Sequence, residues 1–90
     1  MKPKRLWQRI KNGHLNNVAF DDFCRLIESF GFRFARQQGT SHQIYDRDDV
    51  REILTVHPQH DGTAWPYQIR QFRNLVARYD LKQDGEGSAL

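Results

Sequence analysis

Residues 39–45 have the sequence Gly39-Thr40-Ser41-His42-Gln43-Ile44-Tyr45, a short polar turn that leads directly into an apolar segment. Glycine and small polar residues favour a tight turn, whereas isoleucine and tyrosine favour a strand. Strand-like segments also precede the turn, at residues 32–38, and follow it, at residues 51–57. Connections this short join neighbouring antiparallel strands. The sequence therefore predicts a three-stranded antiparallel meander, with its second strand at His42–Asp46.

An amphipathic helix is predicted on each side of the meander. Before it, an apolar stripe at helical spacing is formed by Phe20, Phe23, Cys24, Ile27 and Phe30. After it, a second stripe is formed by Trp65, Ile69, Phe72, Val76 and Tyr79. We therefore expect an α+β fold of order α-β-β-β-α, with two helices on one face of the sheet. Double-stranded RNA-binding domains have this arrangement.

The N-terminal segment is basic and contains no acidic residue before Asp21. Leu6, Trp7 and Ile10 predict a short helix over residues 4–11, which must dock on the rest of the chain to persist. We expect residues 1–19 to form a docked basic arm, with a contact between this arm and RNA phosphates as the alternative. Residues 20–79 would form the domain, and residues 80–90 a flexible tail.

Ninety residues make one small domain, and its formal net charge of +3 suits a polyanionic partner. The single cysteine, Cys24, cannot form an internal disulfide, which indicates a reducing compartment. No apolar run approaches the roughly 20 residues that span a bilayer. We expect a cytoplasmic protein with no membrane partner.

His42 is the first candidate for chemistry among the four histidines. Histidine transfers protons near neutral pH, and RNA can be cleaved when a base deprotonates the ribose 2′-OH and an acid protonates the departing 5′ oxygen. Small residues and backbone N–H groups just before His42 can approach a phosphate closely. The candidates that shape this site or bind RNA are Gly39, Thr40, Ser41, Arg36 and Gln38.

His57 is a possible second proton carrier, because it ends the third strand and would lie near His42 if the register allowed. A structural role before Pro58 is favoured, since catalytic positions are rare. The spacing of His57 and His60 could suit a metal, but no cysteine or carboxylate is placed to complete a tetrahedral set. Cys24 faces the core and is not expected to be a nucleophile. We expect neither a metal nor a cofactor.

Three segments of the chain resemble the HicA family of bacterial toxins. Residues 20–27 with residues 30–32 resemble the first helix and its phenylalanine-bearing exit. Residues 39–45 resemble the Gly-Ser-His-His-Ile-Phe type motif that holds the family's catalytic histidine, and residues 66–73 resemble the final helix. The sequence departs from the family at Thr40, which is inserted between the glycine and the serine, and at Gln43, where a second histidine is common. Thr63 and Trp65 replace lysines that are frequent in the family.

The resemblance implies an mRNA interferase, a metal-independent endoribonuclease toxin of a type II toxin–antitoxin system, with His42 as its catalytic residue. It also implies two partners, which are mRNA and a HicB-type antitoxin that covers the active site. Two other functions remain compatible with the residues alone. The chain could be a non-catalytic RNA-binding module, or a protein–protein adaptor that uses the exposed face or edge of its sheet.

Overall fold

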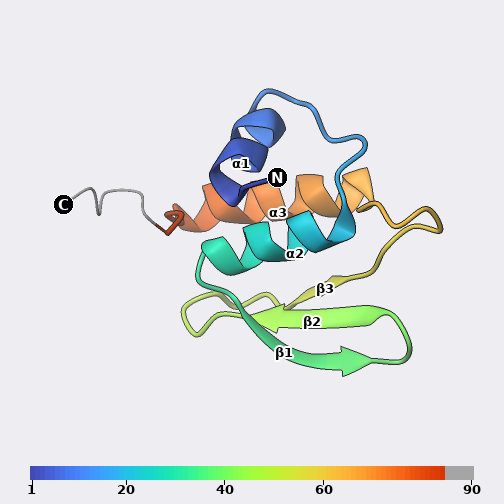
Figure 1. Ribbon diagram of the computed structural model, residues 1–90. Coiled ribbons are helices and arrows are strands. Elements are labelled where there is room, and N and C mark those ends of the chain that lie inside the picture. The colour runs from blue at the N-terminus through green and yellow to red at the C-terminus, as the bar shows by residue number, and fades with distance from the viewer. Residues whose placement is uncertain (85–90) are drawn as a thin grey trace.

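The structure, a computed structural model, describes residues 1–84. The elements in order are α1 (Pro3–Lys11), α2 (Phe20–Ser29), β1 (Arg33–Gln38), β2 (His42–Asp46), β3 (Leu54–Val56) and α3 (Pro66–Tyr79). The strands form one antiparallel sheet of order β1-β2-β3. Figure 1 shows α2 and α3 along one face of this sheet, with α1 packed on their far side. The predicted α+β fold is confirmed.

Helix boundaries follow local chemistry. Two aspartates occupy the first turn of α2, where carboxylates complement the helix dipole. Just beyond the end of that helix, Gly31 has a φ of +87°, a conformation that glycine adopts without strain. Pro66 stands at the start of α3, where its missing N–H breaks no helical hydrogen bond. These signals place both helices where the apolar stripes predicted them.

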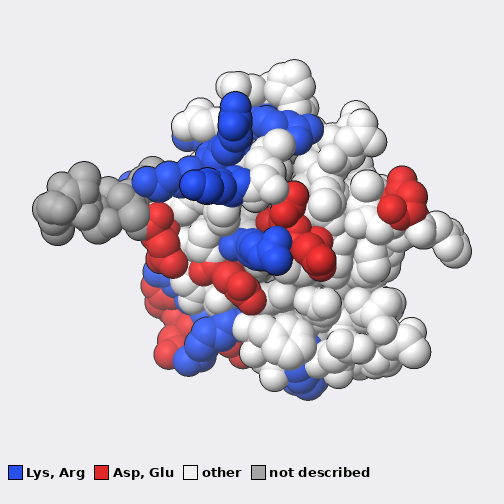
Figure 2. All heavy atoms as spheres, viewed as in Figure 1, with Lys and Arg blue, Asp and Glu red and all other residues white. Residues whose placement is uncertain are grey.

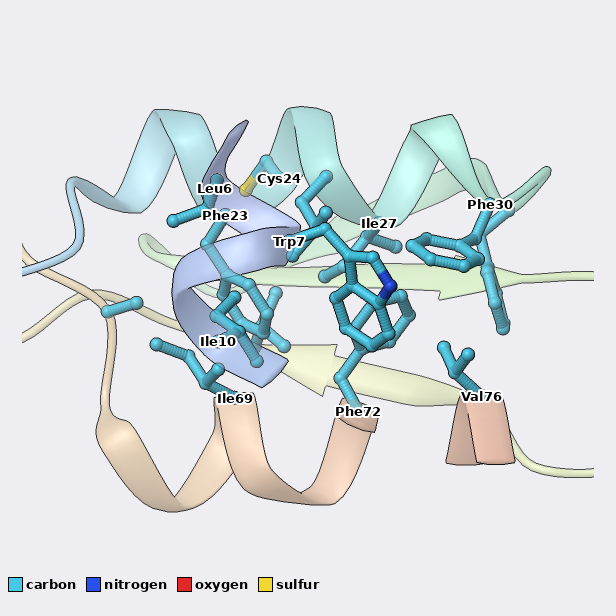
Figure 3. Close-up of a cluster of buried hydrophobic side chains, with 14 of the residues drawn as sticks. Leu6, Trp7, Ile10, Phe23, Cys24, Ile27, Phe30, Ile69, Phe72 and Val76 are labelled. Carbon is cyan, nitrogen blue, oxygen red and sulfur yellow. The ribbon is translucent and has the colours of Figure 1, made fainter. Parts of the chain in front are cut away.

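The core is centred on the ring of Phe72, from α3. It meets four other aromatic rings in edge-on contacts, with centroid distances of 6.2 Å to Trp7, 6.1 Å to Phe23, 5.5 Å to Phe30 and 5.9 Å to Phe32. Figure 3 shows Trp7 and Phe30 beside Phe72, between the helices. Edge-to-face pairs add stabilisation beyond burial alone. One ring therefore joins α1, α2, α3 and the entry to β1.

Helix α1 is docked, as predicted. Leu6 and Ile10 are fully buried, and the Arg73 side chain donates a hydrogen bond of 3.3 Å to the carbonyl of Ile10. The N-terminal amine forms an ion pair of 3.1 Å with Asp22 on α2. Figure 2 shows that Lys and Arg side chains gather over α1. A contact between this basic surface and RNA stays a prediction.

The third strand is shorter than predicted. Residues 51–57 were expected to be extended, but only Leu54–Val56 pair with β2. The backbone N–H of Arg51 instead donates to the Tyr79 hydroxyl at 3.3 Å, and that hydroxyl donates to the Glu52 carboxylate at 2.6 Å. Contacts with α3 therefore hold residues 51–52 away from the ladder, which explains the difference.

The predicted tail also differs in its first five residues. Leu81 and Gln83 are buried, and the backbone N–H of Leu81 closes the end of α3 on the carbonyl of Val76. The Gln83 side chain donates a hydrogen bond of 3.0 Å to the Ser29 hydroxyl. Residues 80–84 therefore pack against α2 and α3 where a flexible tail was expected, and the remainder of the predicted tail lies outside the described residues.

We predict that α1 is part of the cooperative core. Ile10→Ala removes a fully buried side chain, and we expect it to lower the free energy of unfolding by about 2–5 kcal/mol. Gln8→Ala, an exposed position on the same helix, should change it by less than about 0.5 kcal/mol. Urea titration followed by tryptophan fluorescence measures both. Equal, small effects of the two substitutions would mean that α1 docks without stabilising the domain.

Candidate active site

His42 is the first residue of β2 and lies at the end of the β1–β2 hairpin. It stands opposite Gln38 in the ladder, and its side chain is exposed. In the turn before it, Gly39 has a φ of +66°, and the Gln37 side chain donates to the carbonyl of Thr40 at 3.2 Å. The turn thus has a defined shape that presents His42 to solvent.

The sheet face on which His42 lies follows from its neighbours. The Tyr45 hydroxyl donates to Gln43 Oε1 at 2.9 Å, and the Cys24 thiol of α2 donates to the same oxygen at 3.5 Å. Gln43 and Tyr45 therefore point toward the helices. Because successive residues of a strand face opposite sides, His42 and Ile44 lie on the open face. The departure from the family at Gln43 is consequently on the far side of the sheet from His42.

A β-bulge determines the face on which Arg36 lies. Strict alternation from Phe34 would put Arg36 on the helix side, but the register shifts between these two residues, so that Phe34 pairs with Tyr45 and Arg36 with Ile44. Bulges re-aim the side chains that follow them. Arg36 and Gln38 therefore share the open face with His42. Arg36 is exposed and has no ion pair among residues 1–84.

The register of β2 and β3 brings His57 against His42. Gln43 pairs with Val56, so the next pair along the antiparallel ladder would be His42 and His57. Their ring centroids are 4.5 Å apart, with an angle of 39° between the ring planes. The sequence alone did not determine whether these two histidines are close, because that depends on the strand register. The structure places them in contact. Two imidazoles in contact can bind, donate or accept protons at one place on the surface.

Gln68, in the first turn of α3, holds His57 from the other side. Its Oε1 accepts the backbone N–H of His57 at 3.3 Å, and its Nε2 lies 3.2 Å from His57 Nδ1. Nε2 also donates to the Tyr67 hydroxyl at 3.2 Å. Only 5% of Gln68 is exposed, and a buried amide is stable only when its polar atoms are paired. The three contacts meet that requirement.

An aromatic group and a hollow lie beside the histidine pair. The ring of Trp65 is 6.0 Å from His57 and 5.8 Å from Tyr67, which is 46% exposed. The hollow has a volume of about 350 Å³ and is lined by Ser41, His57, Pro58, Gln59, His60 and Trp65. Exposed aromatic rings offer stacking surfaces to unpaired nucleobases. The arrangement is therefore suited to a single-stranded polynucleotide.

Hydrogen bonds fix the loop between β3 and α3. The Asp61 carboxylate accepts the Thr63 hydroxyl at 2.6 Å and the Thr63 backbone N–H at 3.0 Å, and these bonds lower the pKa of Asp61 below its usual value. Gln59 donates to the Thr63 hydroxyl and to the carbonyl of Ala64. Thr63 thus has a structural role where the family often has a lysine.

Among residues 1–84, no group of three or more His, Cys, Asp or Glu could hold a metal ion.

Gln68 is not among the site residues expected from the sequence. The residue lies four positions before Phe72, so it occupies the apolar stripe of α3 as a polar residue. A polar side chain on a buried stripe requires a partner, and this was the signal that could have identified it. No comparable pattern in the sequence indicates that its partner is His57, because that contact joins two separate elements.

Burial on the helix side of the sheet alters two acidic groups. Removal from water raises the pKa of the Cys24 thiol above its usual value, and burial likewise raises the pKa of the Tyr45 hydroxyl. Both groups therefore remain neutral where their free forms would begin to ionise. This agrees with the prediction that Cys24 fills the core, since a reactive thiol needs an accessible thiolate.

Comparison with known protein families finds a match that covers most of the chain. The family model for the HicA toxin of bacterial toxin–antitoxin systems matches residues 20–85, which include the sheet, both helices that cover it and the histidine pair. Helix α1 lies before the matched residues. No curated protein and no solved structure matches the chain. None of the helices in residues 1–84 is both long enough and apolar enough to cross a membrane.

We predict that the domain loses stability at alkaline pH. Because the folded-state pKa values of Cys24 and Tyr45 are raised, the unfolded chain releases these protons first. The contribution of these two groups to the free energy of unfolding is complete below the pKa of the thiol in the unfolded chain, which is about 8.5. It decreases as the pH rises above that value. Urea unfolding between about pH 7 and pH 10.5 should show a shallower decline for the double variant Cys24→Ala/Tyr45→Phe than for the wild type. Tyr67→Phe, at an exposed side chain, serves as the control, and identical declines in all three proteins would contradict the prediction.

Proposed function

The chain belongs to the family of HicA toxins of bacterial toxin–antitoxin systems, and on this premise we propose that it is an endoribonuclease that cleaves mRNA with His42 as its catalytic residue. The observation that carries the proposal is the contact between His42 and His57 on the open face of the sheet. A surface imidazole that is in contact with a second one, and shares its face with Arg36, has the groups that phosphodiester transfer requires.

The proposed reaction uses the ribose 2′-OH as nucleophile. Its oxygen attacks the adjacent phosphorus while the bond to the 5′ oxygen breaks, and the products are a 2′,3′-cyclic phosphate and a 5′-hydroxyl. His42 has one of two alternative roles in this reaction. In the first, it is the base that takes the 2′-OH proton, and water protonates the leaving oxygen. In the second, it is the acid that gives its proton to the leaving oxygen, and water takes the 2′-OH proton. No step of this reaction requires a metal ion.

The neighbouring residues have separate proposed roles. Arg36 stabilises the negative charge that builds on the phosphate, and Gln38 offers an amide to the same group. Gly39, Thr40 and Ser41 shape the turn that leads into His42, and their backbone N–H groups are candidates to bind phosphate oxygens. The exposed ring of Tyr67 supports the choice of single-stranded mRNA, because a base must be unstacked to contact it.

An antitoxin partner follows from the family. We propose that this partner is of the HicB type and that it neutralises the toxin by covering the open sheet face, where it would hide both His42 and Arg36. An exposed His42 supports this mode of inhibition, since RNA and a partner protein would compete for the same surface. We also propose that the toxin acts in the cytoplasm, where translated mRNA is present, and that cleavage inhibits translation and growth.

We predict that His42→Ala lowers the rate of RNA cleavage by about 10²–10⁴-fold, the usual effect of losing a general acid or base. Growth arrest on induction should disappear in the same variant. The measurements are cleavage of purified RNA, with the product ends identified, and growth with transcript integrity in cells. His14→Ala, an exposed histidine outside the site, is the matched control and should retain activity.

The outcomes separate the candidate functions. Undiminished cleavage and growth arrest in His42→Ala would overturn the proposal, and so would products with a 3′-hydroxyl. Salt-sensitive RNA binding by the wild type without any cleavage would identify a non-catalytic RNA-binding module. Binding of a partner protein without RNA binding would identify an adaptor.

We further predict that Arg36→Gln weakens RNA binding. The test uses the His42→Ala background, so that the RNA stays intact, and measures affinity by fluorescence anisotropy across a range of salt concentrations. Loss of one phosphate contact should reduce the slope of log affinity against log salt by about 0.7. Arg25→Gln makes the same charge change on α2, where Arg25 is paired with Asp22, and should leave the slope unchanged. Equal slopes for the two variants would rule out Arg36 as a phosphate contact.

A further inference from the structure

The hydrogen bonds of Gln68 fix which nitrogen of His57 carries the proton. A backbone N–H can only donate, so the Gln68 atom that faces the N–H of His57 must be the carbonyl oxygen Oε1. The atom that faces His57 Nδ1, at 3.2 Å, is therefore the amide nitrogen Nε2. An amide nitrogen has hydrogens to give and accepts none, so Nδ1 must be the acceptor. In the neutral ring the proton then lies on His57 Nε2.

The amide is held firmly in this orientation. Its oxygen accepts from the backbone of His57, and its two N–H groups point to His57 Nδ1 and to the Tyr67 hydroxyl. A rotation of the carboxamide by 180° would place two donors against each other at the backbone contact. Gln68 is also buried and lies on a helix, which restricts its motion. The Nε2–H tautomer of His57 is thus a consequence of the fold.

A proton carrier has to exist with its ring both neutral and protonated, and the hydrogen bond from Gln68 to His57 Nδ1 is compatible only with the neutral ring. Protonation of His57 at Nδ1 would bring its N–H against the Gln68 N–H and break the hydrogen bond. The neutral ring keeps that bond and presents Nε2–H. Among residues 1–84, no side chain or backbone group is hydrogen-bonded to His57 Nε2, so this donor remains free for a ligand.

We propose that Gln68 is a positioning residue that holds His57 as its neutral Nε2–H tautomer, which makes His57 a hydrogen-bond donor to the reacting phosphate and leaves proton transfer to His42. The division of roles rests on the proposed endoribonuclease function, whereas the tautomer does not. The proposed donor role of His57 replaces the expectation that this residue is a second proton carrier. A neutral donor next to His42 can bind a phosphate oxygen and adds no second positive charge to the pair.

The tautomer is tested by nitrogen NMR on the full chain without RNA. Two-bond correlations from the imidazole carbon-bound protons should show His57 Nδ1 unprotonated and Nε2 protonated, with the resonances assigned through a His57→Gln variant. In Gln68→Glu the nitrogen donor becomes a carboxylate oxygen, so Nδ1 should become protonated while Oε1 can still accept the backbone N–H. Gln71→Glu makes the same charge change at an exposed position of α3 and should leave the His57 resonances unchanged. Protonated Nδ1 in the wild type would overturn the inference.

The role of His57 is tested by two substitutions of that residue. His57→Gln retains an N–H donor but cannot transfer a proton, so its cleavage rate should stay within about tenfold of the wild type. His57→Ala lacks the donor and should be slower by about 10²–10³-fold, as when one donor to a developing oxyanion is removed. Thermal melting confirms that each variant is folded. If His57→Gln is as slow as His57→Ala, proton transfer by His57 is required and the assigned role is wrong.

Gln68 itself is linked to cleavage by a double-mutant comparison. Gln68→Leu should slow cleavage by the wild-type protein by about tenfold but should not slow His57→Ala further, because the ring on which it acts is gone. Equal effects in both backgrounds would overturn the positioning role. A wild-type protein that cleaves no RNA, yet shows the Nε2–H tautomer and its reversal in Gln68→Glu, would overturn the proposed function and support the part played by Gln68.

Discussion

The packing of Phe72 is the interaction on which the rest of this structure depends. Its ring contacts aromatic rings from α1, from α2 and its exit, and from the residue that leads into β1. A domain of this size has a small core, so few side chains are available to fix the angle of the helices against the sheet. The same helix carries Gln68 one turn earlier, at the level of His57. Placement of Phe72 therefore also sets the distance from α3 to the histidine pair.

The candidate site is assembled from four separate elements, each positioned by its own constraint. A glycine-containing turn presents His42, the β2–β3 register aligns His57 with it, a bulge turns Arg36 to the same face, and α3 supplies Gln68. Three of these constraints act on the backbone, whereas the contact of Gln68 Nε2 with His57 Nδ1 joins two side chains.

Much of the architecture could be predicted from the sequence because apolar periodicity is a local property. The stripes on α2 and α3 and the strand at residues 42–46 were all correct. The third strand was predicted too long, since the bond between Arg51 and Tyr79 joins segments 28 residues apart. Strict alternation along β1 would put Arg36 on the helix side of the sheet, but the bulge puts it on the open face, and a bulge inserts a residue without a distinct sequence signal. Residues 80–84 are packed where a flexible tail was expected, because Ser29 on α2 binds both Gln83 and Asp84.

The sequence by itself determined the order of elements, the buried stripes and the turn at residues 39–45 that presents His42, because each depends on the spacing of residues close together in the chain. Only the tertiary structure decided that His57 touches His42, that Arg36 shares their face, and that Gln68 directs the proton of His57 to Nε2. Those relations depend on strand register and on the distance between a helix and a sheet edge. Both are fixed only when the core around Phe72 closes.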